Sequence, residues 1–135
     1  MSGLGGIFAY HYAANPMDRG ELARISQRMV ARGPDGAGEW MSADGRVGFA
    51  HRRLATLDLT DAAAQPMASA DGNQIIAFDG AIYNHSDVRR RLEGRGHVFR
   101  SQSDAEVLLR LYADKGEAMV QDLHGVFAFA LWDAE

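Results

Sequence analysis

Ser2 is the residue whose type and position most directly suggest catalysis. It follows Met1 and precedes a glycine-rich apolar stretch, Gly3 to Tyr10. If Met1 is removed, Ser2 carries a hydroxyl and a free α-amine, which titrates at about pH 7.7–8.0 and can act as general base for its own side chain. The same residues also fit a solvated terminus and an ordinary first strand. Taken alone they favour that second interpretation, because chain termini are usually disordered.

Other side chains that could carry chemistry are few. The chain contains no cysteine, which excludes disulfides, thiolate metal sites and a cysteine nucleophile. Five histidines lie far apart, without the spacing of metal ligands, so we expect no metal site and assign each a surface or core role. They are His11, His51, His85, His97 and His124.

Composition is that of a soluble globular protein, with 47% hydrophobic and 24% charged residues. A chain of 135 residues makes one domain or part of one. The net charge of −4 leaves no basic patch, so nucleic acid is not an expected partner. No apolar run approaches the ~18 residues needed to span a bilayer, and the N-terminus lacks the pattern of a signal peptide. We therefore expect a cytoplasmic protein that does not contact a membrane.

The first half of the chain predicts strands with one helix between them. A capping box at Asp18–Glu21 and apolar residues at helical spacing indicate a helix that ends at Gly33-Pro34. Asp44-Gly45 and Asp71-Gly72, each between extended runs, are strong hairpin signals. The hairpin strands are expected over residues 39–42 and 46–50, and over residues 67–70 and 73–78.

The second half predicts mostly helices and one closing strand. Ser103–Glu106 is a second capping box, and the helix that follows presents Val107, Leu108, Leu111 and Tyr112 on one face. Short helices are expected over residues 86–92 and 117–123, and a brief strand over residues 97–100. Val126–Trp132 is a continuous apolar run that predicts a buried strand. This order of elements suggests an α+β sheet sandwich that has been cut short.

Seven short motifs occur along the chain in an order that resembles a known family. Together they resemble the glutaminase domain of class II glutamine amidotransferases, most closely the asparagine synthetase branch, and they span essentially the whole chain. The motifs are Ser2-Gly3-Leu4-Gly5-Gly6-Ile7, Arg32-Gly33-Pro34-Asp35, His51-Arg52-Arg53-Leu54, Gln65-Pro66-Met67, Phe78-Asp79-Gly80-Ala81-Ile82-Tyr83-Asn84, Ser103-Asp104-Ala105-Glu106 and Gly125-Val126-Phe127-Ala128-Phe129.

The resemblance implies a fold and a set of partners. It implies a four-layer αββα sandwich of the N-terminal-nucleophile hydrolase type, with residues 1–135 forming an incomplete amidotransferase domain. The domain would release ammonia from L-glutamine and need no cofactor. A synthetase domain, in the same or another chain, would use ATP and Mg²⁺ to activate aspartate and receive that ammonia. The resemblance leaves open whether the protein forms a homodimer.

The resemblance also implies which residues hold glutamine. Arg53 matches the arginine that binds the α-carboxylate, and a guanidinium fork suits a carboxylate. Asp104 matches the acid that receives the α-ammonium, and Gly80 matches a backbone donor beside the scissile amide. Without the resemblance, Arg53 fits a solvated strand end and Asp104 an acid in the first turn of a helix. The loop expected to line the same pocket comprises Arg53, Leu54, Ala55, Thr56 and Leu57.

The residues that would cleave the amide depart from the family pattern. Ser2 stands where the family has cysteine, and a serine hydroxyl, unlike a thiol, supplies essentially no anion at neutral pH. Asp79 stands where the family has an asparagine that donates to the oxyanion, and losing such a donor costs about 2.7–4 kcal/mol. Only a protonated Asp79 could still donate. Ala81 replaces a glutamate near the ligand, with a smaller expected effect.

Three functions follow from this combination. The first is glutamine hydrolysis through Ser2 to supply ammonia for amide transfer to aspartate, impaired by Ser2, Asp79 and Ala81. The second is a non-catalytic domain of a synthetase, either glutamine-binding or purely structural. The third, an N-terminal serine amidohydrolase acting on another amide, has the least support, since Arg53 and Asp104 suit an α-amino acid.

Overall fold

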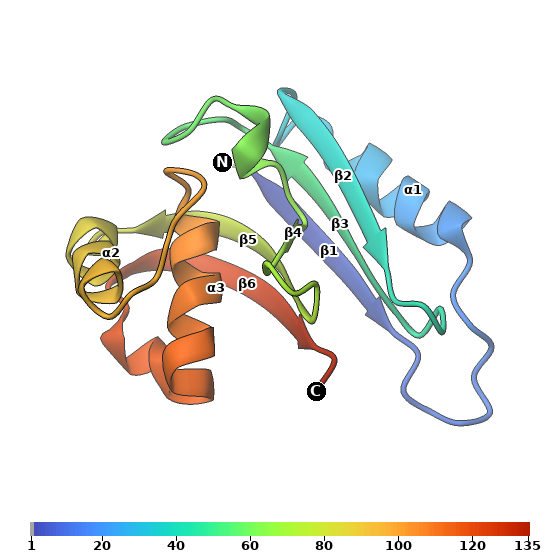
Figure 1. Ribbon diagram of the computed structural model, residues 1–135. Helices are drawn as coiled ribbons and strands as arrows, with labels where there is room; N and C mark the ends of the chain where they lie inside the picture. The colour runs from blue at the N-terminus through green and yellow to red at the C-terminus, as the bar shows by residue number, and fades with distance from the viewer. Residues whose placement is uncertain (1) are drawn as a thin grey trace.

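The first sheet contains the N-terminal strand and the first predicted hairpin. The computed structural model describes residues 2–135, so Met1, whose removal the Ser2 hypothesis requires, lies outside the described residues. Strands β1 (Gly3–Phe8), β2 (Gly36–Met41) and β3 (Val47–Arg53) form an antiparallel sheet in the order β1-β3-β2. The hairpin through Asp44-Gly45 is confirmed. Because β3 runs antiparallel to β1, with Arg52 opposite Gly3, the end of β3 lies beside the N-terminus (Figure 1).

The second sheet contains the second hairpin and the last strand. It has the order β4-β5-β6, with β4 at Met67–Ala68, β5 at Gln74–Ile82 and β6 at Gly125–Asp133. The hairpin through Asp71-Gly72 is confirmed, since Met67 pairs with Ile76. The long β5·β6 pairing runs from Gln74 opposite Asp133 to Ile82 opposite Gly125.

Three α-helices cover these sheets. They are α1 (Arg19–Arg28), α2 (His85–Gly94) and α3 (Asp104–Lys115). Asp18 caps α1 by accepting from the Gly20 N–H, and Ser103 caps α3 by accepting from the Ala105 N–H, as the capping signals predicted. Two 3₁₀ turns, η1 (Asp61–Ala63) and η2 (Gly116–Asp122), complete the elements, and η2 occupies the region predicted as a short helix.

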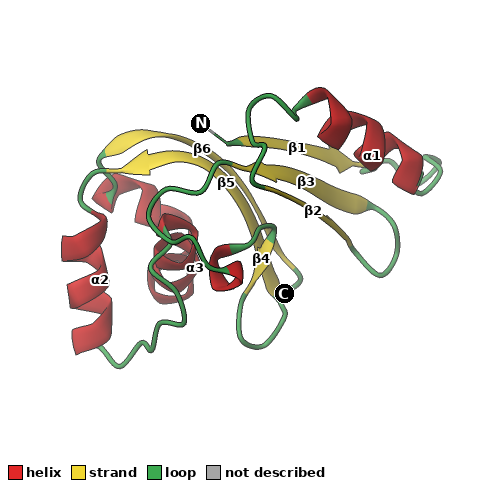
Figure 2. Ribbon diagram, turned by 90° about the horizontal axis from the view of Figure 1, so that it is seen from above, coloured by secondary structure: helices red, strands yellow, loops and turns green. Residues whose placement is uncertain are grey.

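Three apolar clusters define four layers. One, including Leu22 and Ala50, lies between α1 and the first sheet; a second, including Phe49 and Ile75, lies between the two sheets. A third, including Leu108, joins the second sheet to α2 and α3. Figures 1 and 2 show α1 on one side of the paired sheets and α2 and α3 on the other. The predicted αββα sandwich is confirmed.

Two local predictions are wrong. Residues 97–100 form no strand, because the Arg100 and Ser101 N–H groups donate to the buried carboxylate of Glu106 instead of to a neighbouring strand. Strand β6 is half-buried to exposed rather than buried. Only one of its edges pairs with a strand within residues 2–135, and its outward residues, such as Val126, face solvent. Among the described residues, no helix combines the length and apolar character needed to cross a membrane.

Candidate functional site

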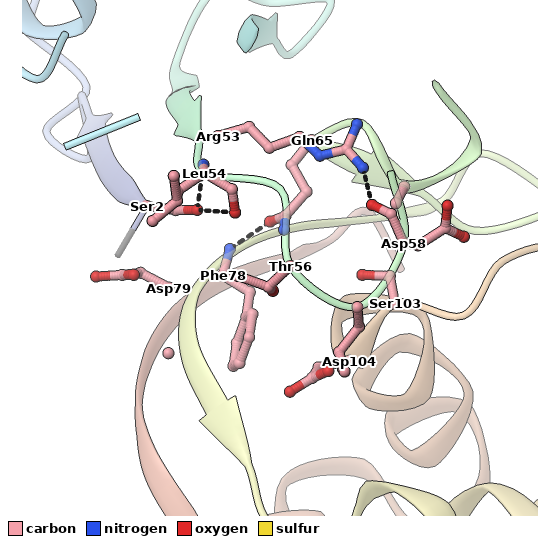
Figure 3. Close-up of a pocket in the computed structure, with 13 residues that line it drawn as sticks. Ser2, Arg53, Leu54, Thr56, Asp58, Gln65, Phe78, Asp79, Ser103 and Asp104 are labelled. Carbon is pink, nitrogen blue, oxygen red and sulfur yellow. Dashed lines mark hydrogen bonds between the residues drawn. The ribbon is translucent and has the colours of Figure 1, made fainter. Parts of the chain in front are cut away.

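A cavity of about 120 Å³ opens where the N-terminus meets the ends of both sheets. Its lining comes from the residue before β1, the end of β3 and the loop after it, the middle of β5, and the start of α3 (Figure 3). The lining includes three acidic residues, Asp58, Asp79 and Asp104, and one basic residue, Arg53. The full lining is Ser2, Arg53, Leu54, Thr56, Leu57, Asp58, Ala63, Gln65, Phe78, Asp79, Gly80, Ser103 and Asp104.

Ser2 is held at the cavity by contacts with two residues, Leu54 and Arg32. Its Oγ accepts a 2.9 Å hydrogen bond from the Leu54 N–H and lies 3.5 Å from the Leu54 carbonyl oxygen (Figure 3). Its own carbonyl oxygen accepts from Nε of Arg32 at 3.1 Å. The hydroxyl is therefore fixed relative to the first residues of the loop that follows β3.

Asp79 forms an ion pair at the Ser2 end of the cavity. Its Oδ2 lies 3.0 Å from Nη2 of Arg32, and its side chain is 15% exposed. Its Oδ1 is buried without a hydrogen-bond partner in the described part of the chain. The guanidinium of Arg32 thus bridges the Asp79 carboxylate and the Ser2 carbonyl, so that these two residues are held together by one cation.

Gly80 has a backbone that only glycine can adopt here. Its φ is +136°, and a Cβ at this position would collide with the Val126 carbonyl oxygen and the Phe127 backbone on β6. Gly80 lines the cavity next to Asp79.

Phe78, just before Asp79, is fixed by two side chains from other elements. Its N–H donates to Oε1 of Gln65 at 2.6 Å, and its carbonyl oxygen accepts from Nε2 of His51 at 2.8 Å. His51 is 1% exposed, and burial lowers its pKa despite the hydrogen bond to Phe78. A neutral His51 with its proton on Nε2 therefore ties β3 of the first sheet to β5 of the second.

Arg53 and Asp104 approach the cavity from different elements. The guanidinium of Arg53 donates to the Thr60 carbonyl oxygen at 2.8 Å and to the Asp58 carbonyl oxygen. Because a guanidinium has five N–H groups, it keeps donors for a further acceptor. Asp104, 6% exposed, accepts from the Ile82 N–H at 2.8 Å, and burial raises its pKa although that hydrogen bond opposes the shift.

Comparison with known proteins agrees with this fold and arrangement. The family model described as a glutamine amidotransferase domain matches residues 1–135. This chain belongs to that family. It is 39% identical over 134 residues to an asparagine synthetase (glutamine-hydrolysing) of Bacillus subtilis, covering 98% of this chain and 21% of that protein. It is 40% identical over 117 residues to asparagine synthetase B of Escherichia coli, covering 87% of this chain and 20% of that protein.

A solved structure shares the fold of this amidotransferase domain. It is the glutamine phosphoribosylpyrophosphate amidotransferase of B. subtilis, with a TM-score of 0.76 and 20% sequence identity. The match covers 99% of this chain and 35% of that chain. The amidotransferase domain described here spans about a fifth of the length of the synthetases that it matches.

Most residues predicted from the sequence line the cavity of the amidotransferase domain, and two do not. Ser2, Arg53, Asp104 and the Asp79-Gly80 pair line it, as do three loop residues, Leu54, Thr56 and Leu57. Ala55 and Ala81 lie outside the lining. Ala55 donates its N–H to Oδ2 of Asp35 at 2.9 Å, and Ala81 is exposed on β5. Their contact with a ligand stays a prediction.

Several site residues of the amidotransferase domain were missed. Asp58, Ala63, Gln65, Phe78 and Ser103 line the cavity. Gln65, Phe78 and Ser103 fall inside motifs quoted above, so the motif match could have found them, whereas Asp58 and Ala63 follow from the three-dimensional path of the loop alone. Within residues 2–135, no group of three or more histidine or acidic side chains could hold a metal ion.

Proposed function

We propose that this domain binds L-glutamine by both of its α-groups and hydrolyses the side-chain amide poorly or not at all. Arg53 supplies the cation for the α-carboxylate, and Asp104 supplies the anion for the α-ammonium. Two observations support this half of the proposal. Both residues line one cavity, and Arg53 keeps N–H donors beyond those bonded to Asp58 and Thr60.

The ion pair between Arg32 and Asp79 carries the other half of the proposal. A carboxylate paired with a guanidinium at 3.0 Å accepts hydrogen bonds and has no proton to donate to an oxyanion. Only the Gly80 N–H then remains as a donor beside the scissile amide. Loss of one such donor removes about 2.7–4 kcal/mol of transition-state stabilisation.

The nucleophile adds a second obstacle. A serine hydroxyl must lose its proton during attack, and the α-amine that could take this proton exists on Ser2 only when Met1 has been removed. The Ser2 hydroxyl also accepts from the Leu54 N–H, which fixes the oxygen without activating it. Hydrolysis through Ser2 is therefore expected to be slow even in the processed protein.

The similarity to asparagine synthetases supports a wider role for the whole protein. We propose that a synthetase domain, in the same or another chain, uses ATP and Mg²⁺ to activate aspartate, and that this domain supplies or once supplied the ammonia. The curated relatives are about five times longer than this chain, so they have room for such a domain. A homodimer and a cytoplasmic location belong to the same proposal.

Three measurements on the purified protein test the proposal. Mass spectrometry establishes whether Met1 is present, calorimetric titration measures binding of L-glutamine with D-glutamine as control, and an ammonia assay measures turnover. We expect stereoselective binding that is lost in Arg53→Ala and Asp104→Ala, with ammonia release near background. Rapid ammonia release by the wild-type chain would contradict the proposed impairment. Absence of binding would leave a purely structural domain.

A further inference from the structure

Asp58 joins the two loops that frame the cavity. Residues 54–60 follow β3, and residues 100–103 precede α3. The Asp58 carboxylate accepts at Oδ1 from the Thr60 N–H at 2.8 Å and from the Thr60 hydroxyl at 2.5 Å. Its other oxygen, Oδ2, accepts from the Gln102 N–H at 2.8 Å. One carboxylate therefore fixes the turn of its own loop and bonds to the neighbouring loop.

The two loops joined by Asp58 carry the two charged residues of the candidate site. Arg53 donates to the carbonyl oxygens of Asp58 and Thr60, so the position of its guanidinium depends on the turn that Asp58 fixes. Gln102 lies two residues before Asp104, the first residue of α3. Asp58 therefore links the loop that holds the Arg53 guanidinium to the backbone two residues before Asp104.

The loop before α3 is also anchored by hydrogen bonds to the buried Glu106 carboxylate. Glu106, 1% exposed, accepts from the Arg100 and Ser101 N–H groups at 2.9 and 2.7 Å, and from the Ser101 hydroxyl at 2.7 Å. Residue 102 follows directly from these anchored positions. On the other side, residues 54–57 are anchored within residues 2–135 mainly by the hydrogen bonds that the Leu54 and Ala55 N–H groups donate.

We propose that Asp58 is a positioning residue that sets the separation of Arg53 from Asp104 and thereby selects ligands carrying both an α-carboxylate and an α-ammonium. The inference rests on the proposed amino-acid site and names a residue that controls its specificity. Asp58 itself acts through Arg53 and need not touch the ligand.

The ionisation of Asp58 supports this role. Hydrogen bonds from the Gln102 backbone and from Thr60 lower the pKa of Asp58 to about 2. The carboxylate is therefore fully charged at neutral pH and can accept from both loops at once. An amide of the same shape cannot do so, because its NH₂ group would face one of the two N–H donors.

Asp58→Asn tests the proposal with two independent readouts. In the unliganded protein, we expect the Gln102 amide to exchange its hydrogen faster, measured by NMR. In binding, we expect the affinity for L-glutamine to fall about tenfold, because a charge-assisted contact is lost. Affinity for the α-amide of glutamine, which has no α-carboxylate for Arg53, should fall much less. Asp61→Asn is the matched control, since Asp61 is an exposed acid in η1 whose carboxylate makes no hydrogen bond or ion pair within residues 2–135.

Two results overturn the inference. Unchanged exchange at Gln102 in Asp58→Asn would show that the carboxylate does not hold that loop. An equal loss of affinity for glutamine and for its α-amide would show a general structural role rather than positioning of Arg53. If the wild-type chain binds no glutamine, the proposed function fails and the selectivity role fails with it, while the Gln102 exchange in the unliganded protein still reports on the loop contact.

Discussion

Replacing Ser2 and Asp79 together should restore glutamine hydrolysis, whereas replacing Ser2 alone should not. Ser2→Cys supplies a thiol whose pKa of about 8.5 gives some thiolate at neutral pH. It leaves the Asp79 carboxylate paired with Arg32, 3.0 Å away. Asp79→Asn removes that charge and returns a side-chain amide that can donate to the oxyanion beside Gly80. Both changes therefore act on the same step of the reaction.

The double variant should differ from Ser2→Cys in two quantities, the rate of hydrolysis and the stability of the fold. One oxyanion donor is worth about 2.7–4 kcal/mol, or about 10²–10³ in rate, so the double variant should exceed Ser2→Cys by that factor. Asp79→Asn also breaks the ion pair with Arg32. Since the Arg32 side chain is 55% exposed, that pair contributes no more than about 0.2–1 kcal/mol. The double variant should therefore remain folded.

Four proteins are needed for the assay: the wild type, the two single variants and the double variant. Each is checked by mass spectrometry for loss of Met1, and ammonia release from L-glutamine is measured alongside glutamine affinity. We expect background rates for wild type and Asp79→Asn, slow turnover for Ser2→Cys, and the full 10²–10³ gain only in the double variant. If Ser2→Cys alone matches the double variant, Asp79 does not impair the oxyanion site and the reasoning is refuted.

Three further predictions concern residues that hold the site in place. Gly80→Ala should lower the unfolding free energy by about 2 kcal/mol or more, because φ is +136° and the new Cβ would meet the β6 backbone. Urea titration measures this change. The control is Gly94→Ala, at a helical position with open space around it, which should not lower the unfolding free energy. Glu106→Gln should lower the unfolding free energy by about 1.5–3 kcal/mol in the same assay, because the new amide NH₂ would face a backbone N–H of the loop before α3. An unchanged urea midpoint would contradict the role of Glu106 in anchoring this loop. Burial lowers the pKa of His51 in the folded protein, so His51 of the unfolded chain is protonated at a higher pH than His51 of the folded chain. The free energy of unfolding should therefore fall as pH drops below about 6.5. His51→Gln should show a shallower pH dependence, and an identical slope would argue against a neutral buried His51.

Much of the fold could be predicted because its local signals agree with its packing. Asp44-Gly45 and Asp71-Gly72 turn hairpins, and Asp18 and Ser103 cap helices. The prediction failed at residues 97–100, where a β-type sequence is held by a side chain instead of a strand. The sequence pattern predicts Glu106 as half of a capping box, but its carboxylate accepts from the Arg100 and Ser101 N–H groups. No sequence pattern distinguishes these two uses of a glutamate at that position.

In the candidate site too, residues inside short sequence motifs could be predicted, whereas contacts between distant parts of the chain could not. Ser2, Arg53 and Asp104 could be identified because each falls inside a short motif, and the structure brings them to one cavity. Arg32 also falls inside a motif, but its contact with Asp79, 47 residues away, depends on how the turn after α1 approaches β5. Asp58 is recognisable only once the loops are seen together, because its partner Gln102 is 44 residues away.

The residues proposed to bind the amino acid, Arg53 and Asp104, are supported by contacts separate from those of Asp79. A substitution at position 79 can therefore leave the binding residues in place. Arg53 is held through Asp58 and Thr60, and Asp104 through the Ile82 N–H, so neither depends on the Asp79 side chain. A buried carboxylate without a partner would be strongly unfavourable at position 79, but Arg32 lies 3.0 Å away and supplies the counter-charge. The domain can therefore carry an acid at position 79 with little loss of stability. On this basis, loss of amide cleavage does not require loss of amino-acid binding.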